Sequence, residues 1–114
     1  MGTNLNIQEM QKRIDQVQAD YREWLMLLPK LEAAQTEWQR AEAVFARLQN
    51  FYEHDYLNYF EVENNGLPLS LKTEGEESVL GEDTLFEAFG ERHTLAMRWL
   101  KLAVKSLDND TEAV

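Results

Sequence analysis

The chain contains no cysteine, and only two prolines, five glycines and two histidines among its 114 residues. Without cysteine there is neither a disulfide framework nor thiol chemistry, and a reducing compartment suits such a chain. The longest apolar run, Trp24–Leu28, stops at Pro29 and is far too short to span a membrane. The first residues lack the basic stretch and apolar core of a signal peptide. We therefore expect a cytoplasmic protein that binds no membrane.

Basic residues are also scarce, because 11 Lys and Arg stand against 21 Asp and Glu, for a formal net charge of −10. The imbalance is concentrated in Phe51–Gly90, where ten acidic residues accompany a single basic one, Lys72. Nucleic acids and anionic membrane surfaces both require clustered positive charge on the protein, so neither is an expected partner. A basic protein partner is electrostatically allowed. A solvated acidic segment that keeps the chain soluble is the simpler interpretation.

Hydrophobic residues nevertheless make up 44% of the chain, so residues 1–114 are predicted to form a single helical domain. Its first part, residues 6–52, has the spacing of one long helical segment that begins at the capping residue Asn6. Apolar residues recur there at alternating steps of three and four, the pattern of a coiled-coil-like seam. The residues of this seam are Ile7, Met10, Ile14, Val17, Tyr21, Trp24, Leu28 and Leu31.

Pro29 interrupts this segment, since a proline inside a helix removes one hydrogen bond and kinks the axis at a cost of about 3 kcal/mol. No Gly, Asn, Asp or Ser flanks it to form a turn, and the apolar register continues beyond it, which favours one helix kinked near Pro29. Such a helix would be about 70 Å long, twice the diameter of about 35 Å expected for a compact domain of this size. We favour a second copy, and hence a homodimer, to cover the overhang. The alternative is a three-helix bundle in which the chain folds back.

The remainder predicts an all-α fold with an irregular middle. Residues 53–81 are predicted to be an irregular acidic segment that contains the turn signal Asn64–Gly66. Residues 82–107 are predicted to form a C-terminal helix that packs against the first, because apolar residues cover all but a narrow stripe of it. Residues 108–114 are predicted to be a frayed tail.

No residue set indicates catalysis, so the chain is predicted not to be an enzyme and to need no cofactor or metal. There is no His-Glu-x-x-His, no glycine-rich phosphate loop and no nucleophile elbow. The segment Glu61–Gly66 resembles the first half of a calcium loop, but Lys72 takes the place of the bidentate glutamate. An enzyme with a metal-assisted acidic pocket, built from Glu61, Glu63 and their neighbours, is a third hypothesis behind two binding functions.

The first hypothesis is a non-enzymatic protein–protein interaction module. Trp24 and Trp38 lie on the seam as candidate interface anchors, although core packing is the default for aromatic residues at helical spacing. The second hypothesis is a small acidic immunity or inhibitor protein that binds a basic partner through its acidic middle segment. The candidate partner-facing residues of that segment are Tyr56, Tyr59, Glu61 and Glu63.

The second half of the chain carries four short motifs in a fixed order. They are the aromatic pair Phe51–Tyr52, the aromatic and acidic run Tyr56–Glu63, the turn Asn65–Pro68, and Val79–Asp83 at a helix start. In this order they resemble a family of short bacterial proteins classed as a domain of unknown function. The resemblance implies a helical first half and a final helix opened by Glu-Asp, and it transfers no site residues. Gly81 departs from the family pattern, which has a serine there.

Overall fold

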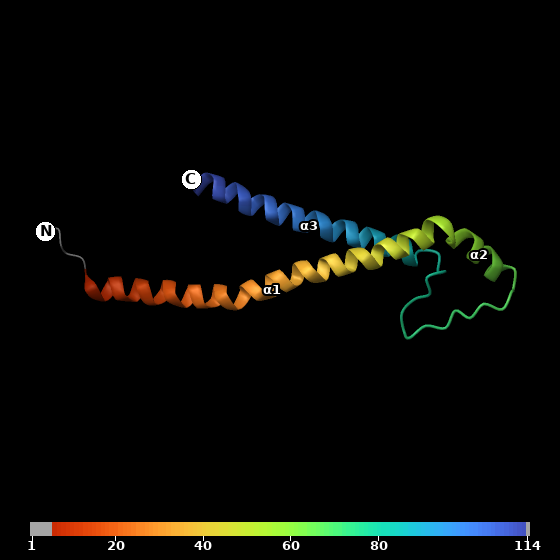
Figure 1. Cartoon of the computed structure of the whole chain (residues 1–114), viewed down its shortest axis with the longest axis horizontal. Coiled ribbons are helices and arrows are strands. Elements are labelled where there is room, and N and C mark those ends of the chain that lie inside the picture. The colour runs from red at the N-terminus through yellow and green to blue at the C-terminus, as the bar shows by residue number, and fades with distance from the viewer. Residues whose placement is uncertain (1–5, 114) are drawn as a thin grey trace. The chain divides into compact units, whose positions relative to one another are not determined.

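The computed structural model describes residues 6–113 of the chain, and every regular element in that range is an α-helix. Helix α1 comprises Ile7–His54, α2 comprises Tyr56–Asn64, and α3 comprises Thr84–Ala113 (Figure 1). The predicted all-α fold is therefore confirmed. None of the helices in residues 6–113 combines the length and apolarity that crossing a bilayer requires.

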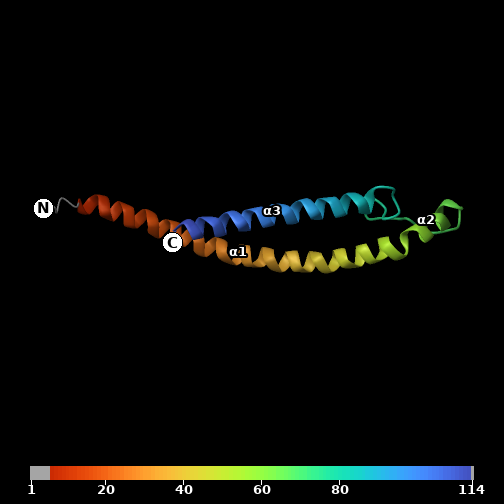
Figure 2. The ribbon, with the colours of Figure 1, turned by 90° about the horizontal axis from the view of Figure 1, so that it is seen from above.

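Helix α1 begins where the sequence predicts. The Asn6 side-chain oxygen accepts hydrogen bonds from the backbone N–H groups of Gln8, at 2.9 Å, and Glu9, at 3.3 Å. These bonds satisfy two of the donors that a helix N-terminus leaves without an intrahelical partner. The helix then continues through Pro29 as one element, which both views of the ribbon show (Figure 1, Figure 2). The three-helix-bundle alternative needed a reversal at Pro29, and it is wrong.

The chain divides into two compact units, unit 1 being Met1–Ala43 and unit 2 being Val44–Val114. Within the described residues, unit 1 contains α1 alone. Unit 2 contains the last turns of α1, all of α2 and α3, and the connection between them. A single helix has no second element on which to bury an apolar face, so any hydrophobic core within one unit has to be in unit 2.

The core of unit 2 lies where α3 begins. Leu85, in the first turn of α3, is 3% exposed, and Leu80, just before that helix, is 8% exposed. Phe89 contacts two rings of α1, with centroids 6.3 Å from Phe45 and 5.4 Å from Tyr52. These contacts hold the first turns of α3 beside the last turns of α1 (Figure 2). The predicted packing of the C-terminal helix against the first is confirmed.

The boundary between α1 and α2 is a single residue, Asp55. Its N–H donates to the Phe51 carbonyl at 2.8 Å and its carbonyl accepts from the Tyr59 N–H at 3.0 Å, so helical bonding continues across the break. The prediction that residues 53–81 are irregular is therefore wrong for residues 53–54, which end α1, and for residues 56–64, which form α2. The helical bonding of α1 extends through aromatic residues whose rings pack on one another, and this packing outweighs the turn propensity of the Asn-rich end.

Helix α2 ends in a Schellman motif. Gly66 has a left-handed φ of 80°, its N–H donates to the Glu63 carbonyl at 2.9 Å, and the Leu67 N–H donates to the Val62 carbonyl at 3.3 Å. These two bonds satisfy carbonyls that the helix end would otherwise leave unpaired, and glycine adopts the required φ without strain. The turn predicted at Asn64–Gly66 is thus the C-terminal cap of a helix.

Gly81 is held tightly at the start of α3. Its N–H donates to the Ser78 carbonyl at 2.9 Å. A Cβ at position 81 would lie 2.6 Å from Thr84 Oγ1, closer than real Cβ atoms approach their neighbours, and 3.0 Å from the Ser78 carbonyl oxygen, a tight contact. The serine of the family pattern would meet the same two atoms. Any residue other than glycine at position 81 would therefore require the Thr84 side chain to move.

The last helix differs from the prediction at both ends. It begins at Thr84 rather than at residue 82, because the backbone from Ser78 to Asp83 first forms the turn around Gly81. It continues to Ala113, so the frayed tail predicted for residues 108–114 is wrong for residues 108–113, and residue 114 lies outside the described residues. No glycine or proline follows residue 90, and without such a breaker the polar composition alone does not end a helix.

Candidate functional site

The most extensive apolar surface in unit 1 is a stripe along α1. Its members lie three and four residues apart, so they share one side of the helix. Each keeps between 42% and 72% of its surface exposed. Within the described part of unit 1 no other element covers them. The residues of this stripe are Ile7, Met10, Ile14, Val17, Tyr21, Trp24 and Leu31.

The two candidate anchors occupy equivalent places on this side of α1, two heptads apart. Trp24 is exposed, whereas Trp38 is half-buried. Trp24 has 48% of its surface exposed, and large aromatic side chains supply much of the binding energy at protein interfaces. The role of both tryptophans as anchors stays a prediction.

Helix α1 is apolar around its whole circumference at one level, which we call the girdle and which comprises Trp24–Leu28. Five successive residues cover more than one turn of a helix with 3.6 residues per turn. Four of them, Trp24 to Leu27, are exposed, and Leu28 is half-buried. Met26 is the most exposed at 66%, and it lies on the side opposite the stripe.

Some polar side chains of α1 form hydrogen bonds with one another within the helix. The Gln11 side-chain amide donates to the Asp15 carboxylate at 2.9 Å, and that of Gln16 donates to Asp20 at 3.1 Å. Both pairs are four residues apart, the spacing at which helical side chains meet. These polar groups border the stripe without crossing it, so they leave its apolar surface continuous.

Unit 2 contains a series of aromatic rings in contact, which we call the aromatic series. It runs from Phe45 to Phe89, Tyr52, Tyr56 and Phe60, with successive ring centroids 5.3 to 6.3 Å apart. Such distances are those at which aromatic pairs contribute beyond their burial. The series links α1, α2 and α3, so these rings stabilise the packing of unit 2.

The structure separates the four residues predicted to face a partner. Tyr56 is half-buried within the aromatic series, and its hydroxyl donates a long hydrogen bond of 3.4 Å to the Gly81 carbonyl. Tyr59 is exposed and contacts Phe51 edge-on at 5.7 Å. Glu61 is exposed and Glu63 is half-buried. Tyr59 and Glu61 are therefore open to solvent, whereas Tyr56 packs within unit 2.

A groove of about 370 Å³ lies in unit 2 between α1 and α3. The Arg92 guanidinium lies 5.8 Å from the centre of the Phe45 ring, a cation–π contact. No sequence pattern indicated this groove, because it forms only when residues some 40 positions apart pack together. His93, one of the lining residues, is exposed. The lining residues are Phe45, Gln49, Tyr52, Glu53, Phe89, Arg92 and His93.

The acidic residues of unit 2 form no metal centre among the described residues, where no group of three or more His, Cys, Asp or Glu is placed to hold an ion. The residues that resemble a calcium loop are helical up to Asn64, so their side chains point away from one another rather than towards a common centre. Glu61 and Glu63 are two residues apart on α2, so they point to nearly opposite sides of the helix, where Glu61 is exposed and Glu63 half-buried.

The model of a family described as a domain of unknown function (DUF4298) matches residues 14–102, more than three quarters of the chain. The match includes α2, the turn at Gly66 and the start of α3. It therefore confirms the resemblance of the second half to a family classed in this way. Neither a curated protein nor a solved structure matches the chain.

Proposed function

The chain belongs to the family described as a domain of unknown function (DUF4298), and we propose that it is a non-enzymatic protein–protein interaction module that forms a homodimer through the stripe of α1. The observation that carries this proposal is the exposure of seven large apolar side chains along a single helix. Contiguous exposed apolar surface of this kind marks an interaction site.

The area of the stripe fits a dimer of ordinary size. Seven large side chains about half exposed, at roughly 150–200 Å² each when fully exposed, present about 600 Å² per chain. Homodimer interfaces are about 65% apolar, so this apolar area corresponds to an interface of about 900 Å² per chain, polar and apolar surface together. Stable interfaces bury about 800 Å² per partner. The stripe therefore supplies the apolar part of such an interface by itself.

A second copy is the partner whose surface matches the stripe in spacing. Residues at alternating steps of three and four on one helix fit between those of another helix with the same steps. The positions that border the stripe do not oppose this pairing, because Gln11 and Gln18 are neutral and Arg13 and Asp20 have opposite charges. Self-association thus needs no complementary protein of different sequence.

Sedimentation equilibrium of the purified chain tests the proposal. We expect a mass of about 27 kDa at micromolar concentration, twice the 13.4 kDa of one chain. Val17→Glu places a carboxylate in the middle of the stripe, where burial without a partner is costly, and is expected to raise the Kd at least about 100-fold. Ala19→Glu adds the same charge two residues away on the exposed polar side and should leave the Kd unchanged.

A wild-type chain that sediments as a monomer contradicts the homodimer. Equal effects of Val17→Glu and Ala19→Glu would also contradict it, because they would show that added negative charge, rather than the stripe, controls association. Circular dichroism of both variants should retain the helix content of the wild type, since both positions are exposed.

A second candidate, a small acidic immunity or inhibitor protein, is favoured by one observation. Of the ten acidic side chains in Phe51–Gly90, eight are exposed, the exceptions being Asp55 and Glu63. A basic protein that approached this segment would meet a concentration of exposed negative charge, which accelerates association at low salt.

Immobilised chain and the triple variant Glu74→Gln, Glu76→Gln and Glu77→Gln test this candidate. A basic protein retained by the wild type at low salt, released as salt rises and not retained by the variant, supports it. Retention that is insensitive to salt or equal for both chains contradicts it. The three positions lie in the exposed connection before α3. Glutamine oxygens can still accept the bonds that Glu76 accepts from the Glu74 N–H, at 2.9 Å, and Glu77 from the Thr84 hydroxyl, at 3.5 Å, so folding should be unaffected.

A further inference from the structure

The girdle extends beyond what a two-stranded coiled coil covers. Met26 lies opposite the stripe and is 66% exposed, whereas the residues four before and four after it on the same side are Arg22 and Lys30. A helix paired along the stripe leaves the opposite side in water. One apolar turn between charged turns therefore indicates that a further helix contacts α1 at this level and not along its length.

Helix α3 also has more apolar surface than one neighbour covers. Leu95, Trp99 and Leu102 follow one another at steps of four and three, and Met97, Leu100 and Val104 do so at steps of three and four. The two rows start two residues apart, so they lie on different sides of the helix. All six side chains are exposed. We call the row Met97, Leu100 and Val104 the second face of α3.

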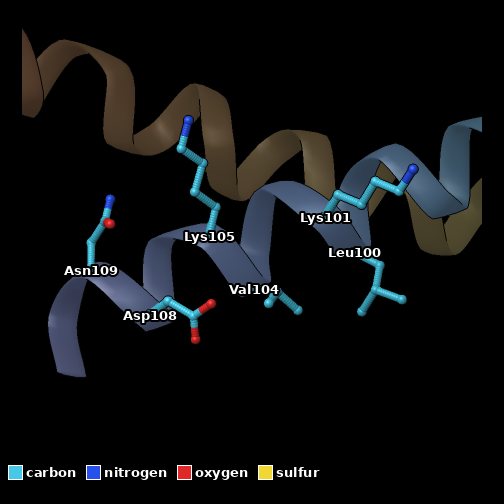
Figure 3. A pocket seen from close by; sticks show the side chains of 6 residues that line it. All are labelled: Leu100, Lys101, Val104, Lys105, Asp108 and Asn109. Carbon is cyan, nitrogen blue, oxygen red and sulfur yellow. The ribbon is translucent and has the colours of Figure 1, made fainter. Parts of the chain in front are cut away.

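The side chains of the second face are not screened by the charged residues beside them. Leu100 and Val104 project from one side of α3, while the amino groups of Lys101 and Lys105 extend towards the other (Figure 3). The apolar surface is therefore accessible to another helix, and the lysine stems leave it open.

We infer that the homodimer proposed above is not a two-stranded coiled coil of α1 alone: the second copy also covers the girdle around Met26 and the second face of α3. This inference rests on the proposed dimer and specifies which surfaces it uses. Outside the stripe, the girdle contributes Leu25, Met26 and Leu27, and the second face contributes three more large side chains. These six side chains are about half exposed and add roughly 500 Å² of apolar surface per chain. With the stripe, the apolar area then reaches about 1,100 Å² per chain, within the range of obligate homodimers.

The area argues for a second copy rather than a foreign partner. Obligate homodimers bury more surface than transient complexes, and their interfaces resemble a domain core divided in two. The stripe, the girdle and the second face occur in one chain of 114 residues, so a dimer brings two of each into one assembly. Two helices from each chain then provide the additional neighbours that the girdle and α3 require.

Sedimentation equilibrium of Met26→Glu and Leu100→Glu tests this inference, with Ala19→Glu and Thr94→Glu as matched controls. Each control introduces the same charge at an exposed position on the polar side of the same helix. We expect Met26→Glu and Leu100→Glu to raise the Kd of the dimer at least about 30-fold, while the controls change it less than about threefold. Met26→Lys and Leu100→Lys should act in the same direction, which excludes an effect of total charge.

Two different failures are distinguishable. A monomeric wild type contradicts both the proposed function and this inference. A dimer that Val17→Glu dissociates, but that Met26→Glu and Leu100→Glu leave as tight as the controls do, keeps the interaction module and overturns the inference. A mass of four chains would also overturn it, because further copies would then cover the girdle. Circular dichroism confirms that each variant remains helical, and a variant that does not is replaced by its lysine counterpart.

Discussion

Two glycines near the start of α3 have opposite surroundings, and the same substitution should change stability in opposite directions. Gly90 lies inside α3, and nothing lies within 4 Å of the position that a Cβ would occupy. Gly81 lies in the turn before α3, where a Cβ would meet Thr84 Oγ1 at 2.6 Å and the Ser78 carbonyl oxygen at 3.0 Å. Neither glycine has a left-handed φ, so alanine is compatible with the backbone at both positions.

The magnitudes follow from these distances. Gly90→Ala should stabilise the chain by about 0.5–1 kcal/mol, because glycine inside a helix is that much less favourable than alanine. Gly81→Ala gains a similar amount of about 0.4–1 kcal/mol from the unfolded state. The methyl group, however, overpacks the turn at a cost of about 1–3 kcal/mol. The net prediction for Gly81→Ala is a loss of about 0.5–2 kcal/mol.

Urea unfolding followed by circular dichroism measures both changes. The chain concentration has to be the same throughout, since association adds to the apparent stability of a dimer. Thr84→Ala in the Gly81→Ala background removes the closer of the two contacts and should recover more than half of the loss. The contact with the Ser78 carbonyl then accounts for the remainder, because backbone is less able to shift than a side chain.

The result that refutes this reasoning is a Gly81→Ala variant as stable as Gly90→Ala. Such a result would mean that the turn from Ser78 to Asp83 widens without cost, and that the glycine is not required there. A loss that Thr84→Ala fails to reduce would instead assign the effect to the backbone contact alone.

Two further substitutions test α1 and the core of unit 2. Pro29→Ala should stabilise the chain by about 1–3 kcal/mol, because it restores an N–H donor inside a continuous helix, and an unchanged or lower midpoint of thermal unfolding would contradict this. Leu85→Ala should cost about 2–5 kcal/mol in urea unfolding, since Leu85 is 3% exposed. Leu57→Ala, at a residue 72% exposed, should cost less than about 0.5 kcal/mol, and similar losses for both would refute the placement of the core.

The first helix was predictable because its signals are local. Asn6 supplies the cap, and the apolar steps of three and four continue past Pro29 without a turn residue nearby. Continuity through the proline followed from that register, and the structure agrees. The end of the last helix was not predictable in the same way, since polar residues such as Asp108 and Asn109 are tolerated in an exposed helix as well as in a tail.

The middle of the chain shows where local signals mislead. The sequence Glu61–Gly66 has the composition of a loop, yet its first four residues complete α2 and the last two cap it. The decisive interaction is tertiary, because Tyr56 and Phe60 are held by a series of rings that reaches Phe89. The sequence of α2 has no periodic pattern that predicts the packing of these two rings.

Neither the core nor the groove of unit 2 could be predicted from the sequence. Apolar residues cover most of α3, so the pattern cannot tell that Leu85 is buried while Leu100 is exposed. The groove beside Arg92 depends on the pairing of α1 with α3, which only the fold establishes. By contrast, the stripe of α1 was predictable, because the spacing of apolar residues within one helix determines which of them share a side.

The aromatic series of unit 2 contains no indole ring, although the chain has three tryptophans. Trp24 and Trp38 belong to unit 1 and Trp99 to α3. Emission excited at the red edge of the absorption band, where tyrosine does not absorb, therefore comes from side chains outside the packed rings. Of the three tryptophans, Trp24 belongs to the stripe, so its replacement by phenylalanine identifies the part of the emission that the proposed dimer would change. A change in that part on dilution, without a change in circular dichroism, would distinguish the proposed association from unfolding of the chain.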